Sequence, residues 1–316
     1  RLLRCVIEHA PPVPASLGPE PESMVVQLQS GERMHYLRWA GTGTTAQPLL
    51  LVHGLARTAW TWLPIGRRLA AAGYRVVAPD LRGHGASDAP LSGYELDSLA
   101  LDMLTVAAGA GWGEAAAGPP VVAAGHGLGA MVVVEMARQQ PASVAGVALL
   151  DSGWEEMVEA TRLLPDQLVE AMVEPPEVMA SMSTYLADRR GFDPATWDAD
   201  QERAARAQVS ERHAGHVGLV TKGSVMRRCV ASMYGYRPLD ALAATGCSVS
   251  VLVAGAATAD DEDERERRLA LDDAALARAE AGLAPMAVHV LDGAGHDLMR
   301  YRPEAVTREL QRLAQP

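Results

Sequence analysis

Residues 121–129 read Val121-Val122-Ala123-Ala124-Gly125-His126-Gly127-Leu128-Gly129. The apolar run at its start is typical of a strand buried on both faces, and residues 128–140 have the spacing of an amphipathic helix. Gly125 and Gly129 flank the centre of the join, where a strand and a helix meet tightly only if the side chains are small. This stretch therefore predicts a strand, a sharp turn centred on Gly127, and a helix.

Further strands and helices are expected on both sides of this unit. Sequence patterns predict buried strands at residues 49–52, 76–78, 147–150, 249–253 and 287–291, two earlier strands at 24–29 and 33–40, and helices at about 60–72, 95–109 and from 303. Because strands and helices alternate, the crossovers should be right-handed and the strands mostly parallel. The predicted fold class is α/β, with a mostly parallel, doubly wound, eight-stranded sheet.

The alternation stops after the sixth strand. Residues 155–238 show several helical segments and no strand pattern, which predicts a helical cap inserted there. The core is then expected at residues 24–154 and 239–316. Residues 1–23 end in a proline-rich stretch and are expected to be a disordered lead-in.

Composition excludes several classes of function. The net charge of −11 argues against a nucleic-acid-binding surface and against binding to an anionic membrane. The 3 cysteines form no CxxC pair, so neither a disulfide nor a zinc site is expected. No apolar run is long enough to span a bilayer, and the first residues are too short and too soon interrupted by charge for a signal peptide, so we expect a cytoplasmic protein. The charge run at residues 260–268 is interpreted as a solvated loop and helix start.

Three other short segments also follow predicted strands. They read LVHGL at residues 51–55, PDLRGHGASD at 79–88 and GAGHD at 293–297. In open α/β sheets the ligand site lies at the carboxyl ends of the strands, where all of these segments fall. Together with the Gly127 turn, in this order and spacing, they resemble the α/β-hydrolase family over roughly residues 24–314. In that family a nucleophile, an acid and a histidine follow one another along the chain.

The resemblance implies a role for several residues. It makes His296 the catalytic histidine, and the backbone N–H groups of Leu55 and Leu128 the oxyanion hole. The residues expected beside the substrate are His53, Gly54, Trp60 and Trp154. The resemblance implies no cofactor and no metal.

Two positions compete for the catalytic acid. Family members carry it either after the strand that ends at Leu150 or after the strand that ends at Val253. The first position is Asp151, directly at the strand end, where a buried carboxylate would orient an imidazole. The second position offers Asp260 or Asp261, although the usual Gly-x-x-Asp spacing is absent there. We favour Asp151, whose alternative role is to cap the helix that follows.

The sequence departs from the family at the centre of the turn. Members carry Ser, Asp or Cys there, whereas Gly127 has no side chain that attacks a substrate. Three explanations are open: an engineered replacement that traps a substrate, a natural loss in a protein that binds a ligand or partner, or chemistry that needs only a His296–Asp dyad as general base. Ser152, beyond the next strand, is a minor candidate for a substitute nucleophile.

The predicted function follows from the family resemblance and from the composition of the cap. Residues 155–238 are rich in methionine and contain tryptophan and tyrosine, which predicts a soft apolar pocket lining. We expect a hydrolase of carboxylic-ester or lactone type, acting on a small apolar carbonyl compound, with the nucleophile absent at Gly127. The alternatives are a ligand-binding protein without activity and a His–Asp dyad enzyme that forms no covalent intermediate.

Overall fold

The computed structural model describes residues 18–41, 47–255 and 262–315. Most of the expected lead-in lies outside these residues, and so do Asp260 and Asp261. The lead-in was predicted to end at residue 23, but the first strand begins at Glu22. Among the described residues, no helix combines the length and the apolar character needed to cross a lipid bilayer.

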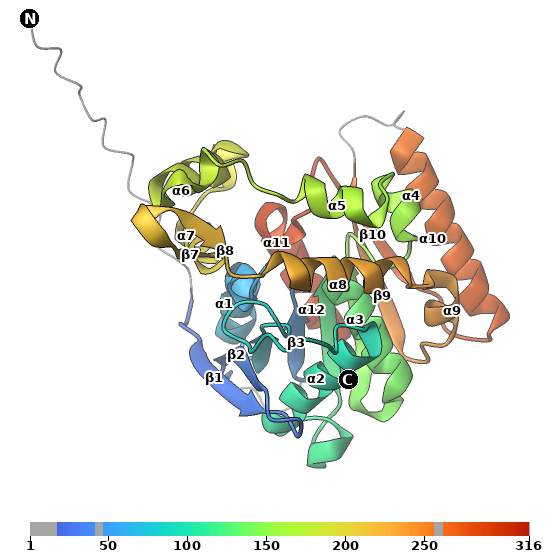
Figure 1. The fold of residues 1–316 in the computed structure, drawn as a ribbon. Helices are drawn as coiled ribbons and strands as arrows, with labels where there is room; N and C mark the ends of the chain where they lie inside the picture. The colour runs from blue at the N-terminus through green and yellow to red at the C-terminus, as the bar shows by residue number, and fades with distance from the viewer. Residues whose placement is uncertain (1–17, 42–46, 256–261, 316) are drawn as a thin grey trace, which may run out of the picture.

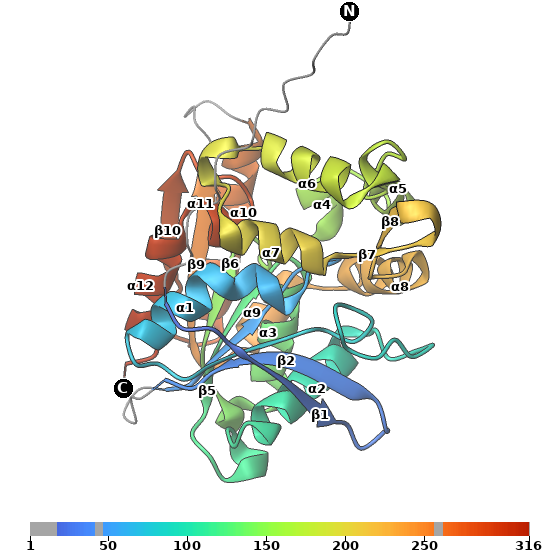
Figure 2. The same cartoon turned by 90° about the vertical axis from the view of Figure 1, so that its left-hand side faces the viewer.

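An eight-stranded sheet forms the centre of the molecule (Figures 1 and 2). Its strands are β1(Glu22–Gln27), β2(Arg33–Trp39), β3(Leu49–Val52), β4(Val76–Pro79), β5(Val121–His126), β6(Val144–Leu150), β9(Ser248–Gly255) and β10(Ala287–Asp292). Their spatial order is β1-β2-β4-β3-β5-β6-β9-β10, with antiparallel pairing of β1 with β2 and of β2 with β4, and parallel pairing elsewhere. The predicted fold class is confirmed.

Helices cover both faces of the sheet. They are α1(Leu63–Ala71), α2(Leu96–Gly109), α3(Leu128–Gln139), α9(Pro238–Ala243), α10(Glu262–Glu280), α11(Leu298–Tyr301) and α12(Pro303–Leu313), with short 3₁₀ turns η1(Ala59–Trp62), η2(Glu114–Ala116) and η3(Pro141–Ser143). Successive side chains of a strand point to opposite faces. Accordingly Leu50 and Val52 join the core under α2 and α3, whereas Leu49 and Leu51 join the core under α1 and α12. The sheet is therefore doubly wound, as expected.

The segment between β6 and α9 lies across one end of the sheet (Figures 1 and 2). Its elements are α4(Met157–Thr161), α5(Pro165–Ala171), η4(Val178–Ala180), α6(Met182–Gly191), η5(Pro194–Thr196), α7(Ala199–Ala207), β7(Val209–Glu211), η6(His213–Gly215), β8(Val217–Leu219) and α8(Gly223–Tyr234). The expectation that this segment contains no strand is wrong, because β7 and β8 form an antiparallel pair. Strands of 3 residues are too short to show an alternating pattern.

The turn from β5 to α3 brings three stretches of backbone into close approach. A Cβ atom on Gly125 would lie 2.1 Å from the carbonyl oxygen of Gly129. A Cβ atom on Gly129 would lie 2.2 Å from the carbonyl oxygen of Val52, at the end of β3. Such separations are far inside van der Waals contact, so both positions require glycine. The backbones of β5, α3 and the turn after β3 are therefore packed directly against one another at this point.

We predict that Gly129→Ala lowers the free energy of unfolding by about 3 kcal/mol or more, because the added methyl group must displace backbone that cannot rearrange locally. Gly191→Ala is the matched control, since a Cβ atom there meets nothing within 4 Å and alanine favours the helix. Urea denaturation followed by circular dichroism measures both. Equal stability of the two variants would contradict this account of the turn.

Candidate active site

Gly127 has the backbone conformation of a sharp strand-to-helix turn. Its φ of 56° and ψ of −125° lie in a region that side-chain-bearing residues rarely adopt. A Cβ atom on Gly127 would have only the Cα of Gly54 near it, at 3.4 Å, which is an ordinary contact. The turn therefore has room for a side chain that the sequence does not supply.

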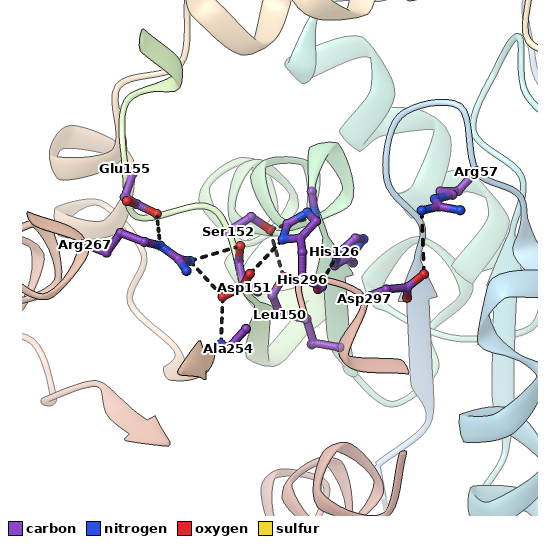
Figure 3. A network of polar contacts seen from close by, with 11 residues as sticks. Arg57, His126, Leu150, Asp151, Ser152, Glu155, Ala254, Arg267, His296 and Asp297 are labelled. Carbon is purple, nitrogen blue, oxygen red and sulfur yellow. Dashed lines mark hydrogen bonds and ion pairs between the residues drawn. The ribbon is translucent and has the colours of Figure 1, made fainter. Parts of the chain in front are cut away.

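His296 and Asp151 form a hydrogen-bonded pair beside this turn (Figure 3). Asp151 follows β6 and His296 follows β10, and 2.7 Å separates the Nδ1 of His296 from the Oδ2 of Asp151. The carboxylate is 4% exposed and the imidazole 60% exposed. Because Nδ1 donates its proton to the carboxylate, Nε2 keeps the lone pair. The structure thus brings together the predicted histidine and the favoured acid.

Asp151 is held by two further donors. Its Oδ1 accepts hydrogen bonds from the backbone N–H of Ala254 and from Nη2 of Arg267, each at 2.8 Å. Burial alone would raise the pKa of Asp151, but the hydrogen bond from His296 and the charge of Arg267 outweigh burial and lower it. The carboxylate is therefore ionised at neutral pH. It does not cap the helix that follows, because the N-cap residue of α4 is Glu156.

His126 lies directly under His296 and is not charged. The two ring centroids are 4.4 Å apart, and Nε2 of His126 donates to the backbone carbonyl oxygen of His296 at 3.0 Å. Burial, with a smaller contribution from the charge of His296, lowers the pKa of His126 to about 3. His126 therefore supports the loop that carries His296 as a neutral ring.

The turn after β3 faces the Gly127 turn. His53 is fully buried, donates from Nδ1 to the carbonyl oxygen of Gly54 at 2.8 Å, and accepts at Nε2 from the N–H of Leu81 at 3.0 Å. Through these two hydrogen bonds the buried ring of His53 fixes the backbone of this turn. Among the described residues, no acceptor takes the backbone N–H of Leu55 or of Leu128. Both of these donors are available to another group.

A cavity of about 820 Å³ lies next to these residues. Gly127, Ser152 and His296 contribute to its wall together with apolar side chains and charged side chains, namely Met131, Met157, Met233, Leu269, Glu155, Glu159, Arg162, Glu266, Arg267 and Asp273. The expected apolar, methionine-rich lining is present only in part, because residues of α4 and α10 also place charged side chains in the cavity wall. In the described part of the chain, no three His, Cys, Asp or Glu side chains are arranged to bind a metal ion.

Four residues were expected beside the substrate but are not among the described residues that line this cavity. They are His53, Gly54, Trp60 and Trp154. Trp60 instead stacks against Arg203 of α7, with the guanidinium carbon 4.0 Å from the ring centroid. Trp154 is 1% exposed and packs under Arg267. Both rings are used in packing, which sequence position alone does not distinguish from contact with a ligand.

Arg267 is the residue of this site that the sequence did not reveal. It lies in the charge run at residues 260–268, which we interpreted as solvated, yet its side chain reaches Asp151 and Glu155. Arginine side chains are mostly exposed in proteins, so one in a dense run of charges is expected at the surface. No local sequence pattern indicates that Arg267 contacts Asp151, which follows a strand more than 100 residues earlier in the chain.

Ser152 uses its hydroxyl group to hold the Gly127 turn. Its Oγ accepts a hydrogen bond from the backbone N–H of Gly127 at 2.7 Å and donates one to the carbonyl oxygen of Leu150 at 2.9 Å. The hydroxyl proton is directed at a carbonyl group and not at His296. This geometry is that of a structural bridge between the ends of β5 and β6.

Comparison with known proteins shows the family of the chain. Residues 49–309 match the family model described as "Alpha/beta hydrolase family". A putative carbamate hydrolase, RutD, of Variovorax paradoxus is 28% identical over 176 residues, which cover 54% of this chain and 61% of the relative. The bifunctional epoxide hydrolase 2 of Sus scrofa is 31% identical over 148 residues, which cover 46% of this chain and 24% of the relative. Both alignments span less than two thirds of the relative.

Solved structures share the fold over nearly the whole chain. E-2-(acetamidomethylene)succinate hydrolase has a TM-score of 0.73 and 20% identity, with 93% of this chain and 98% of that chain covered. The thioesterase domain from the curacin biosynthetic pathway has a TM-score of 0.66 and 20% identity, with 92% and 99% covered. At this identity the likeness concerns the fold.

We predict that acid destabilises this protein partly through His126. An unfolded histidine takes up a proton near pH 6.5 and the folded His126 only near 3, so the free energy of unfolding should fall as pH drops through this window. The loss attributable to one such histidine is about 1.4 kcal/mol per pH unit. His126→Asn should reduce the slope of stability against pH, measured by urea denaturation between pH 7 and 4. His213→Asn, at an exposed position, is the control, and identical slopes for the two variants would refute the prediction.

Proposed function

Because this chain belongs to the alpha/beta hydrolase family, we propose that it is a hydrolase in which His296 and Asp151 activate water directly, without a covalent enzyme intermediate. One observation carries the proposal. The 2.7 Å hydrogen bond from His296 to Asp151 is intact beside a turn whose central residue, Gly127, offers no nucleophile. The base and its orienting acid are present, so water is the remaining source of an attacking oxygen.

The proposed reaction begins at Nε2 of His296. This nitrogen takes a proton from a water molecule as the water oxygen attacks the carbonyl carbon of the substrate. Asp151 stays ionised and stabilises the imidazolium that forms. The imidazolium then returns the proton to the leaving oxygen as its bond to the carbonyl carbon breaks. General base catalysis of this kind contributes about 10²–10⁴-fold in rate.

The oxyanion hole is proposed to act as the family resemblance implies. The backbone N–H groups of Leu55 and Leu128 have no acceptor among the described residues, and Leu128 is the first residue of α3. A helix N-terminus favours negative charge, and preformed donors stabilise the tetrahedral oxyanion more than the ground-state carbonyl. Gly127 and His296 both belong to the wall of the cavity, where the attacking water is proposed to bind.

The proposed substrate is a small ester, a lactone or a related carbonyl compound. Met131, Met157 and Met233 contribute soft apolar surface to the cavity wall, which suits an acyl or alkyl group. One relative is named a putative carbamate hydrolase, and a carbamate, like an ester, is attacked at its carbonyl carbon. A non-catalytic, ligand-binding role is the second candidate, favoured by the missing side chain at Gly127.

We predict that Gly127→Ser creates a covalent route and destabilises the fold. The serine should raise hydrolysis of p-nitrophenyl esters by at least about 100-fold, because His296 would then activate a better placed nucleophile. The positive φ that glycine tolerates costs a serine about 1–3 kcal/mol, so the melting temperature should fall by a few degrees. The double variant Gly127→Ser, His296→Ala should lose the gain. A serine variant that folds but remains inactive would show that the site has lost hydrolytic competence elsewhere.

For the unmodified chain we predict slow ester hydrolysis with neither a burst phase nor labelling by a fluorophosphonate, because no covalent intermediate forms. His296→Ala should reduce the rate by about 10²–10⁴-fold. Ser152→Ala should reduce it less than about tenfold, since it removes one hydrogen bond to the turn. Fluorophosphonate labelling that Ser152→Ala abolishes would instead make that hydroxyl the nucleophile. Ligand binding without any His296-dependent turnover would favour the non-catalytic role.

A further inference from the structure

Arg267 joins two carboxylates behind the catalytic pair proposed above. Its Nη2 lies 2.8 Å from the Oδ1 of Asp151, and its Nε lies 3.1 Å from the Oε2 of Glu155 (Figure 3). The opposite oxygen of Asp151 holds His296. The order of charges leading away from the imidazole is therefore carboxylate, guanidinium, carboxylate.

These charges are poorly screened by water. The side chains of Asp151 and Glu155 are 4% and 8% exposed, and that of Arg267 is 25% exposed. The guanidinium carbon lies 5.1 Å from the ring centroid of the buried Trp154. At such a site the effective dielectric is well below that of water, so a change of one charge is felt by its neighbours.

The two outer groups act on the imidazole in opposite directions. A negative charge behind a histidine favours the imidazolium form, and a positive charge there disfavours it. Arg267 neutralises much of that charge, and Glu155 restores it. With both present, the group as a whole keeps a single negative charge, as a lone aspartate would.

We propose that Arg267 and Glu155 are positioning residues that together set the basicity of His296 through Asp151, with Arg267 weakening the base and Glu155 strengthening it. The proposal rests on the function given to His296 above.

Other charged groups around His296 do not change this balance. Asp297 is paired with Arg57 at 3.7 Å, Glu266 is paired with Arg162, and His126 is neutral. Two more carboxylates, Glu159 and Asp273, belong to the cavity wall and are exposed to solvent, which screens them. The charges that act on the acid from behind are therefore those of Arg267, which contacts Asp151, and of Glu155, which contacts Arg267.

The two carboxylates differ in how readily they take up a proton. Burial raises the pKa of Glu155 despite the opposing effect of Arg267, whereas the pKa of Asp151 is lowered. As pH falls, Glu155 is neutralised before Asp151. The imidazolium form of His296 is then stabilised less, while the hydrogen bond between Asp151 and the ring remains.

The test is the titration of His296 by NMR in the full chain labelled in its histidine rings, with His296→Ala identifying the resonance. Arg267→Gln should raise the pKa of His296 and Glu155→Gln should lower it, each by about half a unit, less than the one to three units of a charge in direct contact. The double variant should return the pKa close to its original value. Arg267→Lys, which keeps the charge, should leave it nearly unchanged.

A structural role alone would not produce shifts of opposite sign that cancel. Shifts in the same direction, or none above about 0.2 unit in either single variant, would overturn the proposal. If Arg267→Gln does not fold, Glu155→Gln and Arg267→Lys still decide, because the first must lower the pKa and the second must not change it. The NMR titration needs no turnover. Absence of hydrolysis would therefore count against the proposed function, whereas only the pKa shifts of His296 decide this inference.

Discussion

The hydrogen bond between His296 and Asp151 joins the ends of two strands that are not neighbours. β9 lies between β6 and β10, and its residue Ala254 donates a backbone hydrogen bond to the other oxygen of the same carboxylate. A buried carboxylate is stable only when its oxygens are paired, so the three strand ends must keep their relative positions. The parallel sheet provides that rigidity. The site is therefore a property of strand order and register before it is a property of any single side chain.

The same end of the sheet explains why the Gly127 turn persists without a nucleophile. Its shape is held by the close approach of Gly129 to Val52, by the bridge from Ser152, and by the packing of His126 beneath His296. None of these interactions needs a side chain at position 127. Glycine also removes the strain that another residue would suffer at positive φ. The turn thus keeps its geometry without a side chain at its centre, as the proposed attack by water requires.

Electrostatics separate the two histidines at the centre of the site. His126 is sealed from solvent and stays neutral, whereas His296 is mostly exposed and has a carboxylate behind it. A buried ring without a carboxylate partner resists protonation, and an exposed ring with one accepts a proton readily. The placement of one acid therefore distinguishes the two imidazoles, and His296 is the one proposed to act as a base. Arg267 and Glu155 continue the line of charges outward from Asp151.

The strands, the helices of the core and the turn at Gly127 follow from the sequence, because buried runs, helical spacing and paired glycines are local signals. The sequence did not predict the β7–β8 pair, because its strands are too short to form a pattern. Trp60 and Trp154 were expected beside the substrate and are found packed against Arg203 and Arg267, since aromatic residues pack as readily as they line pockets. The sequence favoured Asp151 as the acid for His296, but only the tertiary structure shows the two bonded and reveals Arg267 beside them. The contacts of Asp151 with these residues span 145 and 116 positions of the chain. Contacts of that range depend on how the strands order themselves in the sheet, and no local stretch of residues encodes that order.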